Sequence, residues 1–191
     1  MQVGRGRQIE LLGAALDPEV AAVHDGYLTS DGVVELERLA PQLSERFEQI
    51  RVGVHTGAEV VLGAGWNGPV STPAPTIAQV LTSTVALGGY SRHSPQLEAA
   101  CRPLLRAAYL GTLLAAVALE QHTVVLTSIG GGAFGNPAAE IAEAIRWALG
   151  EVDELAPSDL HVVLNLWTSE LGGVLENEVE ERGGQVVLVN E

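Results

Sequence analysis

The chain has 191 residues, 47% of them hydrophobic, which is enough for one domain with a sizeable core and too short for two comfortable domains. The formal net charge is −14, and all ten basic residues are arginine. Nucleic-acid backbones and anionic membranes both require a basic patch, so the charge argues against either as a partner. The absence of lysine excludes a Walker-type phosphate lysine and Schiff-base chemistry.

Targeting and metal-binding patterns are missing from the sequence. The longest apolar stretch, Leu110–Leu119, is shorter than the roughly 20 residues of a membrane span. Met1–Asp17 has neither the apolar run nor the small-residue cleavage site of a signal peptide. The single cysteine, Cys101, cannot form an internal disulfide, and no CxxC or HExxH pattern occurs. We therefore expect a cytoplasmic protein with no metal and no bound cofactor.

The amino-terminal third of the chain combines helical and extended patterns. Apolar spacing of three and four residues predicts a helix over Gln8–Leu16 and a second over Gly32–Gln49. Pro41 lies inside the second pattern and indicates a kink or two shorter helices. The segments expected next are two extended stretches, Arg51–His55 and Ala58–Leu62, and a long loop over Gly63–Pro75.

From residue 77 onward, apolar strands are separated by helices. The expected elements are a strand at Ile77–Leu87, a turn at Gly88–Pro95, a helix at Gln96–Glu120, a strand at Thr123–Ser128, a helix at Pro137–Leu149, a strand at His161–Leu166, a helix at Leu171–Arg182 and a strand at Gln185–Val189. Continuous apolar strands between helices indicate a sheet that is covered on both faces. We predict one α/β domain over residues 1–191, with three layers, α/β/α. Its mixed or mostly parallel sheet has about six strands, with Thr123–Ser128 away from the edge.

The glycine-rich segment between the strand at Thr123–Ser128 and the following helix is the most informative part of the sequence. Asn136 is a good N-cap and Pro137 a good first residue for that helix. Glycine permits positive φ and has no Cβ, so backbone N–H groups can converge on an anion beside the helix N-terminus. A tight turn that uses glycine only for packing would need fewer glycines, so we expect a phosphate-binding loop. Its candidate ligand-binding residues are Ser128, Ile129, Gly130, Gly131, Gly132, Ala133, Phe134, Gly135 and Asn136.

Three of these glycines also satisfy the dinucleotide fingerprint GxGxxG, which makes an NAD(P)-binding Rossmann-type oxidoreductase the alternative. The glycines are Gly130, Gly132 and Gly135. A Rossmann fingerprint normally occupies the first βα unit, and an acidic residue ends the next strand. Here the pattern comes two-thirds along the chain, and the next strand ends in the residues Leu164-Asn165-Leu166-Trp167, which include no carboxylate. The sequence therefore favours a different phosphate-binding family.

The same residues resemble the second phosphate-binding loop of macro domains, in which a strand runs into a small-Gly-x-Gly-x-Phe-Gly-x-Pro segment and then an Ala-rich helix. The segment from Ser128 to Pro137 follows that order, and the resemblance extends over Arg51–Leu149. The chain is also similar to the C-terminal part of longer macro-like proteins of unassigned function, which continue a VHTGAEV-like strand into a Gln-Val-x-x-Ser strand, as at Gln79–Ser83. The resemblance implies that the loop wraps the diphosphate of ADP-ribose or a related nucleotide, with Phe134 against the distal ribose.

The resemblance also carries expectations about activity and partners. Macro domains have an earlier Asn-rich loop that holds the distal ribose and an early Asp, in the first strand, that binds adenine. Here no Asn-rich or glycine-rich loop of that kind occurs before residue 60, and no acidic residue stands in a first-strand position. We therefore expect an assembly, either a homodimer or a complex with a companion polypeptide that supplies early strands and covers an apolar edge. The activity stays open between a reader of ADP-ribose, a hydrolase of ADP-ribosyl or nucleotide substrates, and a non-catalytic subunit of a larger assembly.

Other polar residues carry weaker signals. His55 and Glu59 could form an acid–base pair, although strand alternation explains them better as an exposed polar row. Arg92 and His93 are expected at the carboxyl end of a strand, either near a phosphate or in a solvated turn. The remaining candidates are Ser83 and Thr84 as ladder residues, Asn165 and Trp167 as contacts to a base or as packing residues, and the acidic run Glu176–Glu181 as a solvated face.

Overall fold

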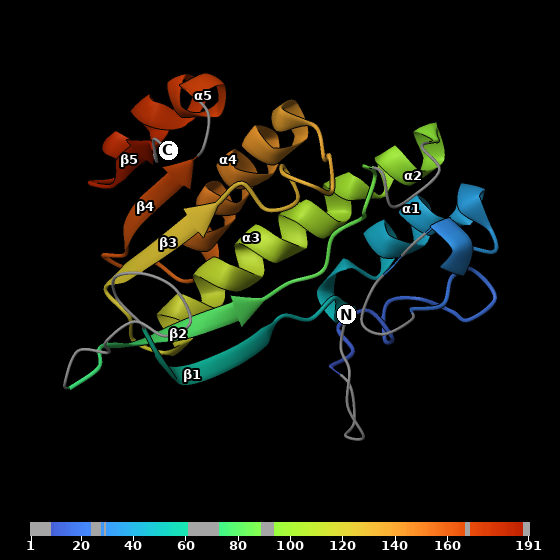
Figure 1. Cartoon of the computed structure of the whole chain (residues 1–191), viewed down its shortest axis with the longest axis horizontal. Coiled ribbons are helices and arrows are strands. Elements are labelled where there is room, and N and C mark those ends of the chain that lie inside the picture. Colours follow the sequence, from blue (N-terminus) through green and yellow to red (C-terminus); the bar gives the residue numbers. More distant parts are fainter. Residues whose placement is uncertain are drawn as a thin grey trace, which may run out of the picture.

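The computed structural model describes residues 9–23, 28, 30–60, 73–88, 94–166 and 169–188. Its described part has five strands in two sheets, so the α/β class is confirmed. β1 (Gly53–Glu59) and β2 (Thr76–Leu81) form an antiparallel hairpin. The other sheet is parallel and consists of β3 (Thr123–Thr127), β4 (His161–Leu166) and β5 (Gln185–Leu188), in that order (Figure 1).

The helices of the parallel sheet lie on one of its faces. α4 (Ala138–Leu155) joins β3 to β4, and α5 (Ser169–Glu180) joins β4 to β5. Because parallel crossovers are right-handed and the strands follow one another in a single direction, both helices come to the same side. α3 (Cys101–Ala118) precedes β3 and packs against α4 behind the sheet (Figure 1). The strand residues that face these helices are buried; they are Val124, Leu126, Val162, Leu164 and Leu166.

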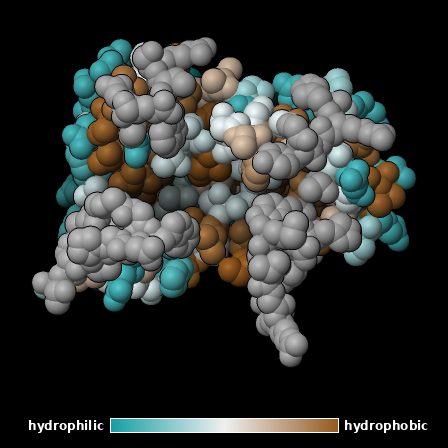
Figure 2. All heavy atoms as spheres, in the orientation of Figure 1, coloured by the Kyte–Doolittle hydropathy of each residue, from teal (hydrophilic) through white to brown (hydrophobic). Residues whose placement is uncertain are grey.

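The opposite face of the parallel sheet carries no helix within the described residues. Val125, at the centre of β3, is 55% exposed, and Thr123 and Thr127 beside it are exposed as well. Figure 2 shows this face, with hydrophobic side chains over β3–β5. Parallel sheets are usually covered on both faces, so this two-layer arrangement is unusual.

The expected single sheet of about six strands is wrong for the described part of the chain. β2 does not pair with β3, and β3 is therefore an edge strand of its sheet. The expected strand at Ile77–Leu87 ends at Leu81, and residues 82–87 leave the hairpin without ladder partners. The expected extended segments at Arg51–His55 and Ala58–Leu62 are instead one strand, β1, with an irregular register between His55 and Ala58.

The expected helix at Gln8–Leu16 is wrong, because residues 11 and 12 form a bend and residues 13–15 and 18–20 form turns. The Glu10 carboxylate accepts the N–H groups of Leu12 and Gly13 at 2.8 and 3.0 Å, which are local bonds that compete with a helix. The apolar side chains that suggested the helix are nevertheless buried: Leu12 is 1% and Leu16 5% exposed. The spacing of apolar residues in this segment therefore indicates which side chains are buried, and it does not indicate a helix.

The second expected helix is divided into three pieces. A 3-10 turn at Ser30–Gly32 is followed by α1 (Leu36–Glu45) and a further 3-10 turn at Phe47–Gln49. Pro41 lies inside α1. It has no N–H to donate and so forgoes one helical hydrogen bond, and the proline does not divide the helix there.

The long helix expected at Gln96–Glu120 is confirmed with one interruption. α2 (Pro95–Ala99) begins at Ser94, whose hydroxyl accepts the N–H of Leu97 at 3.1 Å, and α3 follows after Ala100. By length and composition, Pro95–Ala118 could cross a membrane, but 72% of its most apolar window is buried inside the protein. This helix is the centre of the hydrophobic core.

Candidate functional site

The glycine-rich loop connects β3 to α4 and is closed by its own hydrogen bonds. The N–H of Gly131 donates to the Ser128 carbonyl at 3.0 Å, and the N–H of Asn136 donates to the Gly130 carbonyl at 2.9 Å. Gly130 and Gly135 have φ of +73° and +66°, a conformation that side chains other than glycine rarely adopt. The loop therefore holds a defined shape that its glycines make possible.

Several backbone donors of the loop remain available. Among the described residues, the N–H groups of Gly130, Gly132 and Ala133 donate to no protein acceptor. Gly132 and Ala133 are exposed, so an anion in solution can reach the loop. α4 begins directly behind it and has no side-chain cap on its first N–H groups. Free donors beside the positive end of a helix favour a phosphate or diphosphate group.

Asn136 does not cap α4, contrary to the sequence-based expectation, because Pro137 occupies the N-cap position and Asn136 turns inward. The Asn136 side chain is 4% exposed, and its Nδ2 donates to the carbonyl of Val85 at 2.7 Å. Its Oδ1 is buried without a hydrogen-bond partner. Asn136 and Val85 are 51 residues apart in the sequence. Their buried hydrogen bond therefore fixes the loop to the segment that follows β2.

That segment, Val85–Gly88, is the part of the site that the sequence analysis missed. The N–H groups of Leu87 and Gly88 both donate to the Phe134 carbonyl at 2.7 Å. Gly88 lies so close to the loop that a Cβ there would be 2.3 Å from the Ala133 carbonyl oxygen. The one sequence signal was glycine at residue 88 after an apolar run, which allows this close approach of two backbones.

A small cavity opens on the other side of the loop, at the carboxyl ends of β3 and β4. Its volume is about 290 Å³. The loop contributes Ser128, Gly131, Gly132 and Asn136, and the remaining lining residues are Ala138, Ile141, Leu166 and Leu171. Ligands of open α/β sheets bind in this position, outside the carboxyl ends of the strands. Six of the nine candidate residues are thus cavity-lining residues or free backbone donors.

An ion pair between Arg102 and Glu140 partly neutralises the negative charge at the amino end of α4. Glu140 lies in the first turn of α4, where its negative charge would repel an anion at the loop. Arg102 on α3 binds both oxygens of that carboxylate, with Nε–Oε2 and Nη2–Oε1 distances of 2.9 and 2.8 Å. These hydrogen bonds hold the pKa of Glu140 below its ordinary value. The pair keeps α3 against α4 and balances the acidic charge beside the loop.

Replacing Glu140 by Gln is expected to lower the free energy of unfolding at pH 7 by about 0.5 kcal/mol, because the pair is partly exposed to solvent. The pKa of Glu140 is lowered on folding, so the pair stabilises the fold above the ordinary carboxyl value of 4.5. That stabilisation is lost as the pH falls through the lower folded value. Urea unfolding of both proteins from pH 3 to 7 measures the difference. Glu154→Gln, at an exposed position of the same helix, is the control, and a gap that persists unchanged at pH 3 contradicts the assignment.

The structure does not bring the other sequence candidates to the loop. His55 and Glu59 are both exposed on β1 and make no ion pair with each other. Ser83 and Thr84 are not ladder residues, since β2 ends before them, and Thr84 is buried. Arg92, His93 and Trp167 lie outside the described residues, as does most of the expected loop at Gly63–Pro75, while Asn165 pairs with Thr127 in the sheet register.

The acidic run on α5 is a solvated face only in part. Glu176 and Glu180 are exposed, as expected. Glu178 is half-buried, and it accepts a hydrogen bond from Arg146 Nε on α4 at 2.6 Å. This bond fixes α5 to α4 and has no contact with the glycine-rich loop.

A groove of about 750 Å³ separates β2 from β3 and ends at the first residues of the loop. β2 and β3 form its walls, and Thr112, Ala116 and Leu119 of the α3 region lie between them. No ladder joins the two strands, so both present a free edge to the groove within the described chain. An unpaired edge of this kind favours association with a further strand.

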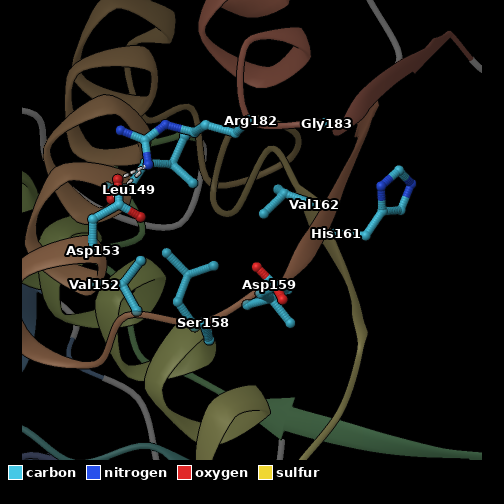
Figure 3. Close-up of a pocket in the computed structure, with 11 residues that line it drawn as sticks. Leu149, Val152, Asp153, Ser158, Asp159, His161, Val162, Arg182 and Gly183 are labelled. Carbon is cyan, nitrogen blue, oxygen red and sulfur yellow. Dashed lines mark hydrogen bonds and ion pairs between the residues drawn. The ribbon is translucent and has the colours of Figure 1, made fainter.

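A different pocket, of about 410 Å³, lies at the amino end of β4 and so at the opposite end of the strands from the loop. Figure 3 shows the Asp153 carboxylate against the Arg182 guanidinium, while the His161 ring points away from the other lining side chains. These two charges neutralise each other, and the other acid of the lining, Asp159, would repel an anion. The glycine-rich loop therefore remains the better candidate, although its cavity is smaller.

Among the described residues, no group of three or more His, Cys, Asp or Glu side chains could hold a metal ion. Cys101 is buried, and burial raises the pKa of its thiol to about 12, so it is an unreactive core residue. Comparison of the sequence with protein-family models and with curated proteins finds no match.

Proposed function

We propose that the chain is a macro-type domain that binds ADP-ribose or a related diphosphate nucleotide through the loop from Ser128 to Asn136. The observation that carries the proposal is the set of free N–H groups at Gly130, Gly132 and Ala133, next to the uncapped start of α4. Backbone donors of this kind bind phosphate without a basic side chain, as a protein without lysine requires.

A diphosphate fits the arrangement better than a single phosphate. Free donors occur both in the loop and in the first turn of α4, and together they offer contacts to two phosphate groups. The cavity of about 290 Å³ beside the loop offers the Ser128 side chain and apolar contacts to the rest of a nucleotide. Phe134 is half-buried in the same loop, and in this proposal it lies against a ribose, as the macro resemblance implies.

We propose that the protein is a reader, which binds ADP-ribose without converting it. Hydrolysis of an ADP-ribosyl or nucleotide substrate is the other outcome that the calorimetric experiment below can reveal. Among the described residues that line the cavity, no histidine, acid or cysteine is placed to act as nucleophile or general base. The geometry therefore supports binding more directly than turnover.

An NAD(P)-binding oxidoreductase is the alternative, and one observation favours it. β3, the glycine-rich loop, α4 and β4 form a right-handed parallel unit, which is the context that a GxGxxG fingerprint requires. β4 lacks the acidic residue that would bind a ribose, since its last polar residue is Asn165. The macro-type proposal needs no such residue.

Calorimetry with ADP-ribose, NAD, ADP and AMP tests the proposal. We expect micromolar affinity for ADP-ribose, weaker binding of ADP and weakest binding of AMP, because each loses contacts to the loop or the cavity. Gly130→Ala should remove binding, because its Cβ would lie 2.9 Å from Asn136 Cγ and the backbone φ is +73°. Gly150→Ala, at an open position of α4, is the control. Preference for NAD with hydride transfer supports the alternative, and release of ADP-ribose from modified protein supports a hydrolase.

We further propose a cytoplasmic protein that works as a homodimer or with a companion polypeptide, with neither nucleic acid nor membrane as partner. Within the described residues, β3 has no strand partner on its outer edge, and Val125 is 55% exposed on a face that carries no helix. Both features support an additional layer, which would complete a three-layer, macro-like arrangement. Light scattering after size-exclusion chromatography should give a mass above the 20.0 kDa of one chain once the partner is present. A stable monomer that binds nucleotide alone at micromolar affinity contradicts this proposal and leaves the loop assignment intact.

A further inference from the structure

The hydroxyl group of Tyr109 lies in the bend where β3 becomes the glycine-rich loop. It donates a hydrogen bond to the Thr127 carbonyl at 2.8 Å and accepts one from the Ile129 N–H at 2.9 Å. Thr127 is the last residue of β3, and Ile129 directly precedes Gly130. One side-chain atom therefore bridges the residues on either side of the bend.

Tyr109 is held rigidly by the helix that carries it. Its side chain is fully buried near the middle of α3. α3 is joined to α4 by two arginine–carboxylate pairs, Arg102 with Glu140 and Arg106 with Glu143. α3 thus contacts the loop at its entry, through Tyr109, and α4 at the loop's exit, through the arginines.

The bend sets the direction in which the free donors of the loop point. Gly130 follows Ile129 directly, and its positive φ turns the chain toward Gly132 and Ala133. Without the hydroxyl, Ile129 keeps only its short bond to the Thr127 carbonyl, at 2.8 Å. A small rotation at this bend displaces the N–H groups between it and the anchored residues Phe134 and Asn136, and these include the free donors.

We infer that Tyr109 is the positioning residue of the anion-binding loop: its hydroxyl fixes the bend at Thr127–Ile129 and so aims the N–H groups of Gly130, Gly132 and Ala133 at a shared phosphate. The inference rests on the proposed function, since it concerns the same loop. Tyr109 does not itself line the cavity beside the loop. Its ring fills the core, and its hydroxyl serves the site.

Burial also keeps the hydroxyl in the form that this role requires. It raises the pKa of Tyr109 far above the ordinary value of 10, so the group stays protonated and can donate to Thr127 throughout the neutral range. The hydroxyl therefore keeps its proton over the neutral range of pH.

Tyr109→Phe tests the inference, because it keeps the ring and removes only the hydroxyl. Thr112→Val is the matched control: Thr112 is buried one turn further along α3, and its hydroxyl donates only to the Ala108 carbonyl of its own helix, at 2.7 Å. Both variants lose one buried hydroxyl. We expect Tyr109→Phe to weaken the binding of inorganic pyrophosphate and of ADP-ribose at least tenfold in calorimetry, and Thr112→Val to change it by less than about twofold.

Amide chemical shifts supply a readout that general destabilisation does not reproduce. Tyr109→Phe should move the signals of Ile129 and of residues 130–133 selectively, and Thr112→Val should leave them in place. Equal losses of affinity in both variants, or an unchanged affinity with unmoved signals in Tyr109→Phe, overturn the inference.

Two further outcomes remain decisive. If the wild-type protein binds neither pyrophosphate nor ADP-ribose, the proposed function fails. The selective amide shifts of Tyr109→Phe then decide alone whether the Tyr109 hydroxyl fixes the conformation of the loop. If Tyr109→Phe does not fold, the wild-type hydroxyl proton is followed instead, since burial slows its exchange enough for observation by NMR. It should shift when pyrophosphate binds, and an unmoved hydroxyl signal at saturating pyrophosphate contradicts the inference.

Discussion

Replacing Gly88 by alanine is expected to lower the free energy of unfolding by about 2–4 kcal/mol and to abolish nucleotide binding. A Cβ at this position would lie 2.3 Å from the carbonyl oxygen of Ala133 and 3.3 Å from its carbonyl carbon. These are backbone atoms, so the glycine-rich loop would have to move as a unit. That movement breaks the bonds that Leu87 and Gly88 donate to Phe134. Urea unfolding and calorimetry with ADP-ribose measure the two effects.

Gly132→Ala is the control for the effect on stability, because it lies in the same loop. A Cβ on Gly132 meets no atom within 4 Å, so the free energy of unfolding should change by less than about 0.5 kcal/mol. A Gly88→Ala protein that unfolds like Gly132→Ala and binds ADP-ribose like the wild type would show that the segment after β2 does not pack against the loop.

Replacing Asn136 by aspartate should destabilise the protein by about 3 kcal/mol at pH 7, although the two side chains have nearly the same shape. The change removes the Nδ2 group that donates to the Val85 carbonyl and places a buried negative charge against that oxygen. The same charge would oppose a phosphate at the loop. We therefore expect loss of stability and of ADP-ribose binding together.

The pH dependence of Asn136→Asp identifies the cause. Burial raises the folded pKa of the introduced carboxyl above its unfolded value of about 3.9, so the destabilisation is complete above the folded pKa. It should diminish as the pH falls toward 4, because the protonated acid can donate to Val85 again. Asn177→Asp, on the exposed face of α5, should show no such dependence. A gap between wild type and Asn136→Asp that stays constant from pH 7 to 4 would contradict the buried contact with Val85.

The carboxyl-terminal half of the fold could be predicted from the sequence because its signals are local. The strands at Thr123–Thr127 and His161–Leu166 are continuous apolar runs, and the helix between them has regular apolar spacing. Glycine and proline mark the boundary between strand and helix, so the position of the loop followed as well. These features depend on a few neighbouring residues and not on distant contacts.

The features that the sequence did not reveal depend on distant contacts. Asparagine is a common N-cap residue, yet the Asn136 side chain donates its hydrogen bond to the carbonyl of Val85, 51 residues away in the sequence. Residues 82–87 are apolar enough for a strand, but they join no ladder, and the Val85 carbonyl and the Leu87 N–H bond to the loop instead. Tyr109 looks like any core aromatic on a helix, and only the fold shows that its hydroxyl reaches the bend after β3. Neither propensity nor periodicity contains this information.

An NMR titration of the isotopically labelled protein with ADP-ribose and with inorganic pyrophosphate tests the central claim most directly. The largest amide shifts should occur at Gly130, Gly132 and Ala133 and in the first turn of α4, because these N–H groups have no protein acceptor and would bond to the phosphates. Both ligands should move the same signals, with ADP-ribose also affecting Phe134. Shifts confined to the pocket around Asp153 and Arg182, or no shifts at millimolar ligand, would contradict the assignment of the glycine-rich loop as a diphosphate-binding site.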